Sequence, residues 1–340
     1  MIRPSVQALA PYVPGEQPKL KRIVKLNANE NAYPPSPKVK EALRDFDPAR
    51  LRLYPDPECT HLRHLLARRY GCKAANVFVG NGSDEVLALA TRAFVEDGGA
   101  VGCFDPTYSL YPVLSEIRNV VCRRAPLNDD FTWRTPPSDF AADLFFLTNP
   151  NAPTSIAYPK SEIAAFCKSF SGVVLIDEAY ADFAEDNCMD LATTAGNRNV
   201  IVSRTLSKSF SLAGIRTGYC IGPADLIDAM YKVKDSYNLD GVTQVVALAA
   251  LNDLDWMRAN AAKIKATRAR VASELKARGW SMPQSSTNFL FVRPPDGDAR
   301  RIFDALRDKG IFVRFFASTP DYIRITIGTD AEMDRLLAEL

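Results

Sequence analysis

Short apolar runs alternate with amphipathic stretches through the first two thirds of the chain. Residues 100–104, 143–148 and 173–177 are apolar at nearly every position, whereas the segments between the runs repeat apolar residues at helical spacing. Strands that are apolar on both faces are typical of a parallel sheet covered by helices on both sides. Together with runs at 77–79, 119–122, 199–202 and 217–221, this pattern predicts an α/β fold with a mostly parallel sheet of seven strands.

The pattern changes after about residue 240. Residues 251–278 have the spacing of one or two long amphipathic helices, and further runs predict strands at 288–292, 312–315 and 322–327 and helices at 298–309 and from 329. We therefore predict a large domain over 28–240. The remaining residues, 1–27 and 241–340, are predicted to form an N-terminal arm and a small C-terminal α+β domain.

Composition removes several classes of function. The chain has 340 residues, a formal net charge of +2 and a charged fraction of 24%, so nothing indicates nucleic acid or a membrane surface as a partner. No apolar run is long enough to cross a bilayer. The two histidines, His61 and His64, have no further ligands nearby, so no metal site is expected. Seven scattered cysteines without a C-x-x-C pair favour a reducing cytoplasm.

A lysine among hydroxyl side chains follows the strand predicted at 199–202. Thr205, Ser207 and Lys208 come first, and Arg216 follows eight positions after the lysine. Hydroxyls and a guanidinium can bind a phosphate, and an amine whose pKa is lowered by burial and by Arg204 and Arg216 can form a Schiff base. Pyridoxal 5'-phosphate requires both features. A serine-rich surface loop is the simpler alternative, and this stretch alone leaves both readings open.

An acid ends the apolar run that precedes this stretch. Asp177 follows Val173–Ile176, and a charge at the end of a buried strand needs a partner. A protonated pyridine nitrogen is such a partner, and Tyr180 can donate to the phenolate oxygen of the same ring. An ordinary helix cap is the alternative. Ligands of α/β sheets bind at the carboxyl ends of strands, and this favours the cofactor reading.

A glycine-rich turn follows the first predicted strand. Gly82, Ser83 and Asp84 open a helix whose free backbone N–H groups would suit a phosphate. The turn is not a Walker loop, because no Gly-Lys-Ser/Thr sequence follows. Tyr108 occupies a comparable place after the next strand, where an aromatic ring can stack on a cofactor or pack in the core.

Taken together, these stretches resemble the aminotransferases of the aspartate aminotransferase fold, and in particular the histidinol-phosphate aminotransferase family. The resemblance covers nearly the whole chain, and its motifs stand in that family's order: Asn27–Asn31, Tyr54–Asp56, Gly82–Glu85, Asp177–Tyr180, Thr205–Lys208, Ala213–Arg216 and Arg324–Thr329. It implies the fold type I of pyridoxal-phosphate-dependent transferases. It also implies a homodimer that transfers an amino group between L-histidinol phosphate and 2-oxoglutarate.

The resemblance implies a role for each matching position. Lys208 would bind the cofactor and move the substrate proton, Asp177 would pair with the ring nitrogen and Tyr180 with the ring oxygen. The cofactor phosphate would be held by Ser83 and its neighbours, Ser207 and Arg216. Tyr54 would reach the cofactor of the partner subunit. The substrate's phosphate or carboxylate would be surrounded by Tyr12, Arg314 and Arg324.

One motif departs from the family pattern, which is Asn-Pro-x-Asn-Pro-Thr-Gly. This chain has Asn149-Pro150-Asn151-Ala152-Pro153-Thr154-Ser155, so the asparagine that bonds the ring oxygen in the family falls at Ala152. The contact is therefore missing, or Asn151 or Asn149 supplies it by a local shift of the loop. Of these alternatives, we expect Asn151 to compensate.

Three rival functions remain open. Arg324 could bind a carboxylate in an aromatic or broad-specificity aminotransferase, because a guanidinium suits carboxylate and phosphate alike. A lyase resembling threonine-phosphate decarboxylase would also take an amino phosphate. A non-catalytic binding module is disfavoured, because Lys208 and Asp177 are both present.

Overall fold

The structure is a computed structural model that describes residues 1–11, 15–17 and 23–340. Its larger part is built on a seven-stranded sheet in the order β2-β8-β7-β6-β5-β3-β4. β8 is antiparallel to both of its neighbours, and the other neighbouring pairs are parallel. The strands are β2 (Val77–Gly80), β3 (Ala100–Asp105), β4 (Val121–Pro126), β5 (Leu144–Thr148), β6 (Val173–Asp177), β7 (Val200–Thr205) and β8 (Gly218–Ile221).

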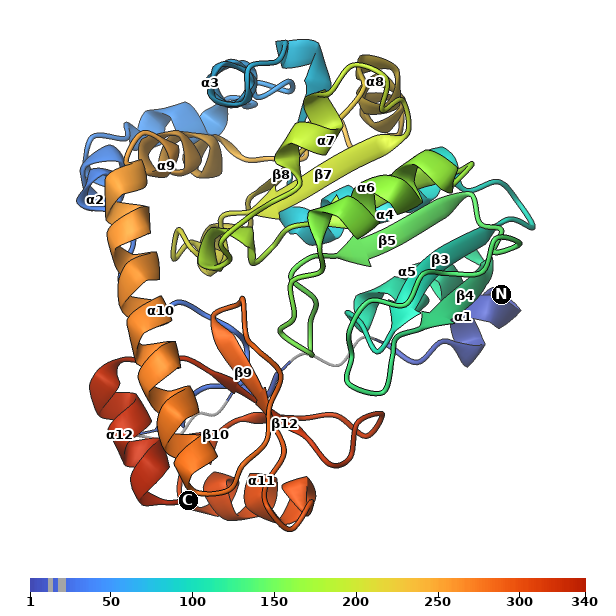
Figure 1. Cartoon of the computed structure of the whole chain (residues 1–340). Coiled ribbons are helices and arrows are strands. Elements are labelled where there is room, and N and C mark those ends of the chain that lie inside the picture. Colours follow the sequence, from blue (N-terminus) through green and yellow to red (C-terminus); the bar gives the residue numbers. More distant parts are fainter. Residues whose placement is uncertain (12–14, 18–22) are drawn as a thin grey trace.

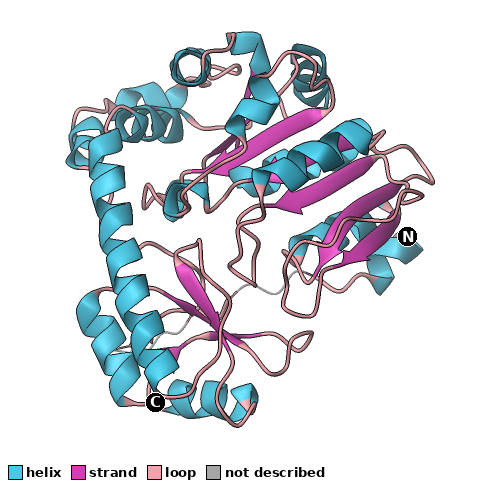
Figure 2. Ribbon diagram, viewed as in Figure 1, coloured by secondary structure: helices cyan, strands magenta, loops and turns pink. Residues whose placement is uncertain are grey.

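Helices cover both faces of this sheet, as Figures 1 and 2 show. Apolar side chains of α4 (Gly82–Phe94), α5 (Leu110–Arg118) and α8 (Ala224–Val233) pack against one face. The other face is covered by α3 (Thr60–Tyr70), α6 (Lys160–Ser169) and α7 (Met189–Thr193). Every residue of β5 is buried, which is why its sequence is apolar throughout.

The C-terminal part holds a three-stranded antiparallel sheet in the order β11-β12-β9. Its strands are β9 (Phe289–Val292), β11 (Arg314–Phe315) and β12 (Ile323–Thr326), and its helices are α11 (Ala299–Asp308) and α12 (Asp330–Ala338). α12 begins with a capping box in which Thr329 and Glu332 satisfy each other's backbone N–H groups. The single helix α10 (Leu254–Ala277) runs along both parts of the molecule (Figure 1).

The segment around β1 belongs structurally to the C-terminal part, although it precedes the large part in the sequence. Strand β1 (Val24–Lys25) pairs in parallel with β10 (Ile311–Phe312). Beyond it, the chain enters the large part through elements packed beside α9 (Gly241–Leu251). The remaining elements are α1 (Pro4–Ala8), which lies beside α5, α2 (Pro37–Arg44), and the short 3-10 helices η1 (Pro48–Arg52), η2 (Ala74–Asn76), η3 (Ala181–Phe183) and η4 (Ala213–Ile215).

The predicted fold class is confirmed, with seven strands in the large sheet and a smaller α+β part. The stretch predicted as one or two helices at 251–278 is the one helix α10, preceded by the last residue of α9. The domain limits at 28 and 240 stay a prediction. Helix α9 lies beyond residue 240 and still packs against α2 and α3.

Candidate active site

A cavity of ≈ 270 Å³ lies where the carboxyl ends of the sheet strands face the C-terminal part. One wall comes from the start of α4 and the ends of β5, β6 and β7. The opposite wall comes from the segment 27–30 and from β11, β12 and Phe316. Most of the residues predicted for the site meet here. The cavity is therefore the candidate active site.

Asp177 closes the bottom of the cavity at the end of β6. Its side chain is 3% exposed, its Oδ2 accepts a hydrogen bond of 3.0 Å from Tyr111, and its Oδ1 accepts one of 3.2 Å from the N–H of Ala179. Burial raises the pKa of Asp177 to about 6. Among the described residues, no lysine or arginine forms an ion pair with this carboxylate. A buried carboxylate that faces a cavity without an ion-pair partner can bind a ligand that presents a cationic N–H.

Tyr111 fixes the orientation of Asp177 and was missed by the sequence analysis. It is fully buried on α5, its ring stacks on Phe146 at 4.7 Å, and its hydroxyl also meets the hydroxyl of Thr148. The sequence offered little signal, because a buried tyrosine on a helix usually belongs to the core. Tyr111 contributes a buried polar tip that holds the carboxylate.

Lys208 follows β7 and points into the same cavity. Its Nζ donates to the backbone oxygen of Ala28 at 3.3 Å. The pKa of Lys208 is lowered to about 8, chiefly by burial and then by the cation of Arg324, with a smaller effect of Arg216. The expectation that Arg204 lowers this pKa is corrected, because Arg204 lies on β7 and is paired with the carboxylates of Glu178 and Asp182.

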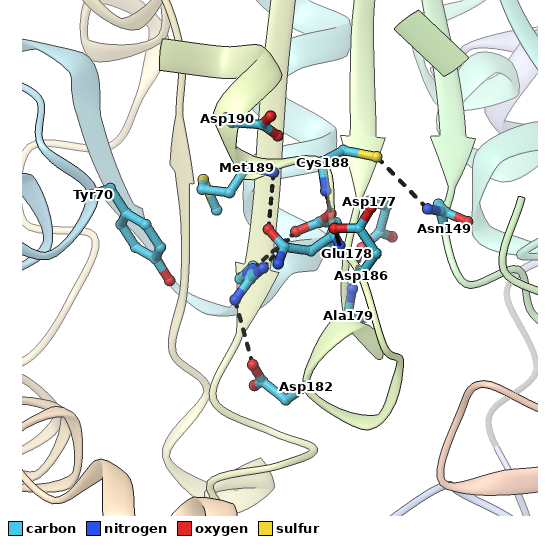
Figure 3. A network of polar contacts seen from close by, with 12 residues as sticks. Tyr70, Asn149, Asp177, Glu178, Ala179, Asp182, Asp186, Cys188, Met189 and Asp190 are labelled. Carbon is cyan, nitrogen blue, oxygen red and sulfur yellow. Dashed lines mark hydrogen bonds and ion pairs between the residues drawn. The ribbon is translucent and has the colours of Figure 1, made fainter. Parts of the chain in front are cut away.

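Those carboxylates form the network shown in Figure 3. Arg204 donates from Nε and Nη2 to Oε2 of Glu178 at 2.9 and 2.8 Å, and from Nη1 to Asp182 at 3.3 Å. Glu178 is 2% exposed and also accepts the N–H of Cys188, while Asp182 accepts the hydroxyl of Ser209. The network thus ties the loop after β6 to the residue that follows Lys208.

A cluster suited to a phosphate lies beside Lys208. Arg216 donates to Ser207 at 3.3 Å and contacts Asp84 at 3.1 Å, and the hydroxyls of Thr205 and Ser207 are 3.0 Å apart. The cluster faces the first turn of α4, where Asn81 makes no side-chain capping bond. The first N–H groups of a helix lack intrahelical partners, so they are available to an anion here.

Two glycines keep this cluster open. Gly82 has φ +81°, and a Cβ built on it would lie 2.8 Å from Nη2 of Arg216. A Cβ on Gly218 would lie 2.4 Å from the backbone nitrogen of Ser83. Any side chain at either position would push the guanidinium or the helix turn out of place.

The predicted aromatic residues Tyr180 and Tyr108 both line the cavity. The Tyr180 hydroxyl accepts a hydrogen bond of 2.8 Å from Nδ2 of Asn29, and its ring centroid is 5.9 Å from Nζ of Lys208. Tyr108 donates to Asp84 at 3.3 Å. Asn29 was recognised only as part of a motif, because its contact spans 151 residues of sequence.

Two arginines stand on the opposite wall. Arg314 and Arg324 are directly paired across β11 and β12. Their guanidinium carbons lie 5.4 and 5.2 Å from the ring centroid of Phe316, which lies in contact with both. Arg324 also donates to the backbone oxygen of Asn27 at 3.0 Å. Two cations held on one aromatic ring at the side of a cavity suit an anionic ligand group.

The expected compensation by Asn151 is corrected. Its side chain is buried between its own loop and the loop that follows β3, where Nδ2 donates to the backbone oxygen of Pro106 and to Thr154, and Oδ1 accepts from Thr107. Ala152 lines the cavity, whereas Asn151 does not. These three bonds hold the loop. They use both hydrogens of Nδ2, so the Asn151 side chain has no N–H left to donate to a ligand in the cavity.

Two further predicted residues lie elsewhere. Tyr54 is 80% exposed on the surface, where its ring stacks on Tyr237 at 4.4 Å, and it does not line this cavity. Tyr12 lies outside the described residues.

The described part of the chain contains no group of three or more His, Cys, Asp or Glu side chains placed to hold a metal ion. No helix within residues 1–11, 15–17 or 23–340 combines the length and apolarity that a membrane crossing requires. All seven cysteines are free thiols.

Comparisons with known proteins agree with this geometry. Residues 21–340 match the family model of aminotransferases of class I and II. The chain is 44% identical to histidinol-phosphate aminotransferase from Chromohalobacter salexigens, with 99% of this chain and 97% of that protein covered. It is also 44% identical to the enzyme of the same name from Marinomonas sp., with coverage of 98% and 97%.

A solved structure shares the fold over nearly the same length. The crystal structure of histidinol-phosphate aminotransferase from Sinorhizobium meliloti, in complex with pyridoxal 5'-phosphate, matches with a TM-score of 0.89 at 30% identity. The match covers 99% of this chain and 95% of that one.

Proposed function

Since the chain belongs to the aminotransferases of class I and II, we propose that it transfers the amino group between L-histidinol phosphate and 2-oxoglutarate. The names of its relatives support this substrate. The observation that carries the proposal is the pair Arg314 and Arg324, which lines the cavity with Lys208 and packs on the ring of Phe316. An amino phosphate needs an amine-handling group and an anion site in one cavity, and these two walls supply them.

The residues present fit pyridoxal 5'-phosphate as the cofactor. The buried Asp177 has no cationic partner among the described residues, and this suits a protonated ring nitrogen. Arg216, Ser207, Thr205 and the start of α4 form a cradle that a Cβ on Gly82 would fill. Around the ring, we assign Asp177 to the ring nitrogen, Tyr180 to the ring oxygen and Tyr108 to the ring face. The phosphate is assigned to Gly82, Ser83, Asp84, Thr205, Ser207 and Arg216.

When bound, the cofactor withdraws electrons from the substrate's Cα, so that the Cα proton becomes acidic. Lys208 would be the residue that accepts this proton and gives it back. Its pKa of about 8 suits both steps, because a general base works best when its pKa lies near the working pH. Burial and Arg324 produce this value. Arg324, which we assign to the anionic group of the substrate, therefore also lowers the pKa of Lys208.

We assign the substrate phosphate to Arg314 and Arg324. Two guanidinium groups can hold a phosphate through several charge-assisted hydrogen bonds, which a single lysine cannot match. The keto acid 2-oxoglutarate would present a carboxylate to the same arginines in the second half of the cycle. Tyr12 is proposed as a third member of this anion site and lies outside the described residues.

The proposal includes a homodimer with shared sites. Tyr54 is assigned to the cofactor of the partner subunit, and its exposure of 80% in one chain supports this assignment. The exposed Leu51 and Leu53 precede it in the chain and line the same surface hollow, and burial of such residues is the usual driving force for association. A cytoplasmic location is proposed from the seven free thiols.

A half-reaction tests the substrate assignment. Protein loaded with pyridoxal 5'-phosphate is mixed with L-histidinol phosphate, L-phenylalanine or L-threonine phosphate without a keto acid, and the visible absorption band is followed. We expect the band to disappear fastest with histidinol phosphate. Faster loss with phenylalanine would assign Arg324 to a carboxylate and indicate an aromatic aminotransferase. Release of carbon dioxide from threonine phosphate would indicate a lyase. Failure to bind the cofactor would refute the proposal as a whole.

A further inference from the structure

Three successive residues, Asn27, Ala28 and Asn29, form a strap in the wall of the cavity opposite the sheet. The backbone oxygen of Asn27 accepts from Arg324 at 3.0 Å, and that of Ala28 accepts from Lys208 at 3.3 Å. The side chain of Asn29 donates to the Tyr180 hydroxyl at 2.8 Å. Each residue of the strap thus contacts one of the groups assigned to substrate or cofactor.

The strap is itself fixed by the C-terminal part. The N–H of Asn29 donates to Thr326 at 3.0 Å, and Asn288 donates to the backbone oxygen of Asn29 at 3.0 Å. Asn29 is 1% exposed and has φ 54°, a left-handed conformation that asparagine tolerates better than most residues. Both the backbone N–H and the backbone oxygen of Asn29 are therefore held by residues of the C-terminal part.

The hydrogen bonds around Asn29 have a defined direction. The Thr326 hydroxyl donates to Oδ1 of Asn29 at 3.0 Å, and Nδ2 of Asn29 donates to Tyr180. The Tyr180 oxygen is therefore an acceptor on its Asn29 side. Within the described part of the chain this hydroxyl has no other hydrogen-bond partner. Its own proton is left to point into the cavity.

We propose that Asn29 is a positioning residue that keeps the Tyr180 hydroxyl a hydrogen-bond donor toward the ring oxygen of the bound cofactor. This inference rests on the proposed function. It has added weight in this chain because Ala152 lines the cavity with a methyl group and Asn151 is engaged elsewhere. Tyr180 is then the side-chain donor for that oxygen, and the strap sets the direction in which the Tyr180 O–H bond points.

The inference predicts the sign of a spectroscopic change. A hydrogen bond donated to the ring oxygen stabilises the negative charge of that oxygen. This charge is greatest once the nitrogen that joins Lys208 to the cofactor has lost its proton. A well-directed Tyr180 therefore lowers the pH at which the visible band of the bound cofactor titrates. Removing the control by Asn29 lets the hydroxyl turn away, so the midpoint of that titration rises.

The main variant is Asn29→Gly, because glycine accepts the positive φ and removes only the amide. We expect the midpoint of the visible band to rise by about 0.5 to 1 pH unit in the cofactor-loaded protein. Asn29→Asp should raise it further, since a carboxylate accepts the Tyr180 proton and draws the hydroxyl away from the cavity. Thr326→Val should act in the direction of Asn29→Gly, whereas Thr326→Ser keeps the hydroxyl and the wild-type midpoint.

A double-mutant cycle separates positioning from general disturbance. In a Tyr180→Phe background, Asn29→Gly should cause no further shift, because its effect passes through the missing hydroxyl. Asn199→Ala is the matched control, since Asn199 donates to three backbone oxygens at the far end of β7. It should lower stability and leave the midpoint unchanged. The other charges that act on Tyr180 or Lys208 are kept in every variant: Glu30, Asp84, Asp177, Arg216 and Arg324.

An unchanged midpoint in Asn29→Gly would overturn the inference while leaving the proposed function intact. A shift of the same size in the Tyr180→Phe background would also overturn it, because Asn29 would then act without the hydroxyl. A wild-type protein with no titrating band would contradict the proposed function and this inference together.

Discussion

The two walls of the cavity are held in place by different means. Asp177 and Lys208 lie at or just after the ends of neighbouring strands, and Arg216 precedes the next strand, so a single buried sheet sets their separation. On the other wall, Arg314 lies on a strand of two residues and Arg324 on one of four. Their positions depend on partners far away in the sequence. In the proposed function, the sheet wall carries the chemistry common to the family, and the other wall carries the anion site that selects a substrate.

Lys208→Ala removes the central group of the sheet wall and should have the largest effect. We expect kcat to fall by at least about 10³-fold with every amino donor, because the proton carrier is lost. The fold should persist at neutral pH, since the change removes a buried cation. Steady-state kinetics and thermal unfolding check both parts, with Lys232→Ala on the surface of α8 as the control. Turnover within tenfold of wild type would contradict the assignment of Lys208 as the proton carrier.

Arg324→Lys tests the other wall while keeping its charge. A lysine loses the bidentate contact with an anion and the packing on Phe316, so KM for the phosphate substrate should rise about 10–100-fold. The visible spectrum of the bound cofactor should keep its shape. Arg300→Lys, which changes an exposed arginine on α11, is the matched control. A loss confined to kcat would show that Arg324 acts in the chemical step and not in substrate binding. The two walls would then not differ in role.

The buried amine of Lys208 should also be visible in the stability of the cofactor-free protein. Its pKa is lowered from 10.5 to about 8, so between these pH values the unfolded chain binds more protons than the folded one. The free energy of unfolding should therefore rise with pH across this window, by up to about 1.4 kcal/mol per pH unit from this group.

Urea unfolding at pH 7.5, 8.5 and 9.5 measures this rise. Comparison with Lys208→Met isolates the contribution of the lysine, because the thiols and tyrosines that titrate in the same range are shared. Parallel curves for the two proteins would show that the amine is not buried as described. The exposed Lys168, changed to Met, controls for the loss of one lysine.

What could be predicted from the sequence follows the same division. Asp177 was assigned to the site because it ends a predicted strand, where ligands of α/β sheets bind. Lys208 and Arg216 were assigned because an amine, hydroxyls and a guanidinium in one stretch suit pyridoxal phosphate, and because the motifs resemble the family. Arg204 was misjudged, since its partners Glu178 and Asp182 lie on the neighbouring strand's loop. Such pairings depend on side-chain direction, which periodicity leaves undefined within a loop.

The contacts that sequence reasoning missed are the distant ones. Tyr111 meets Asp177 across 66 residues, and Asn29 meets Tyr180 across 151. Asn151 was expected in the cavity because its neighbour Ala152 could not serve, yet its side chain bonds to Thr154 and to Pro106 and Thr107 in the loop after β3. A motif identifies which residues matter, while the choice of partner follows from tertiary packing.

The strap has a consequence for how the protein is made. Its bonds to Thr326 join residues 297 positions apart, and β1 pairs with β10 over a similar span. On the ribosome, the sheet that carries Asp177 and Lys208 is complete once β8 has emerged, while the strap still lacks every C-terminal partner. The sheet wall with Lys208 can therefore form before the wall that holds Arg324. Under the proposed function, translation must reach the last strand before a nascent chain can discriminate among amino donors.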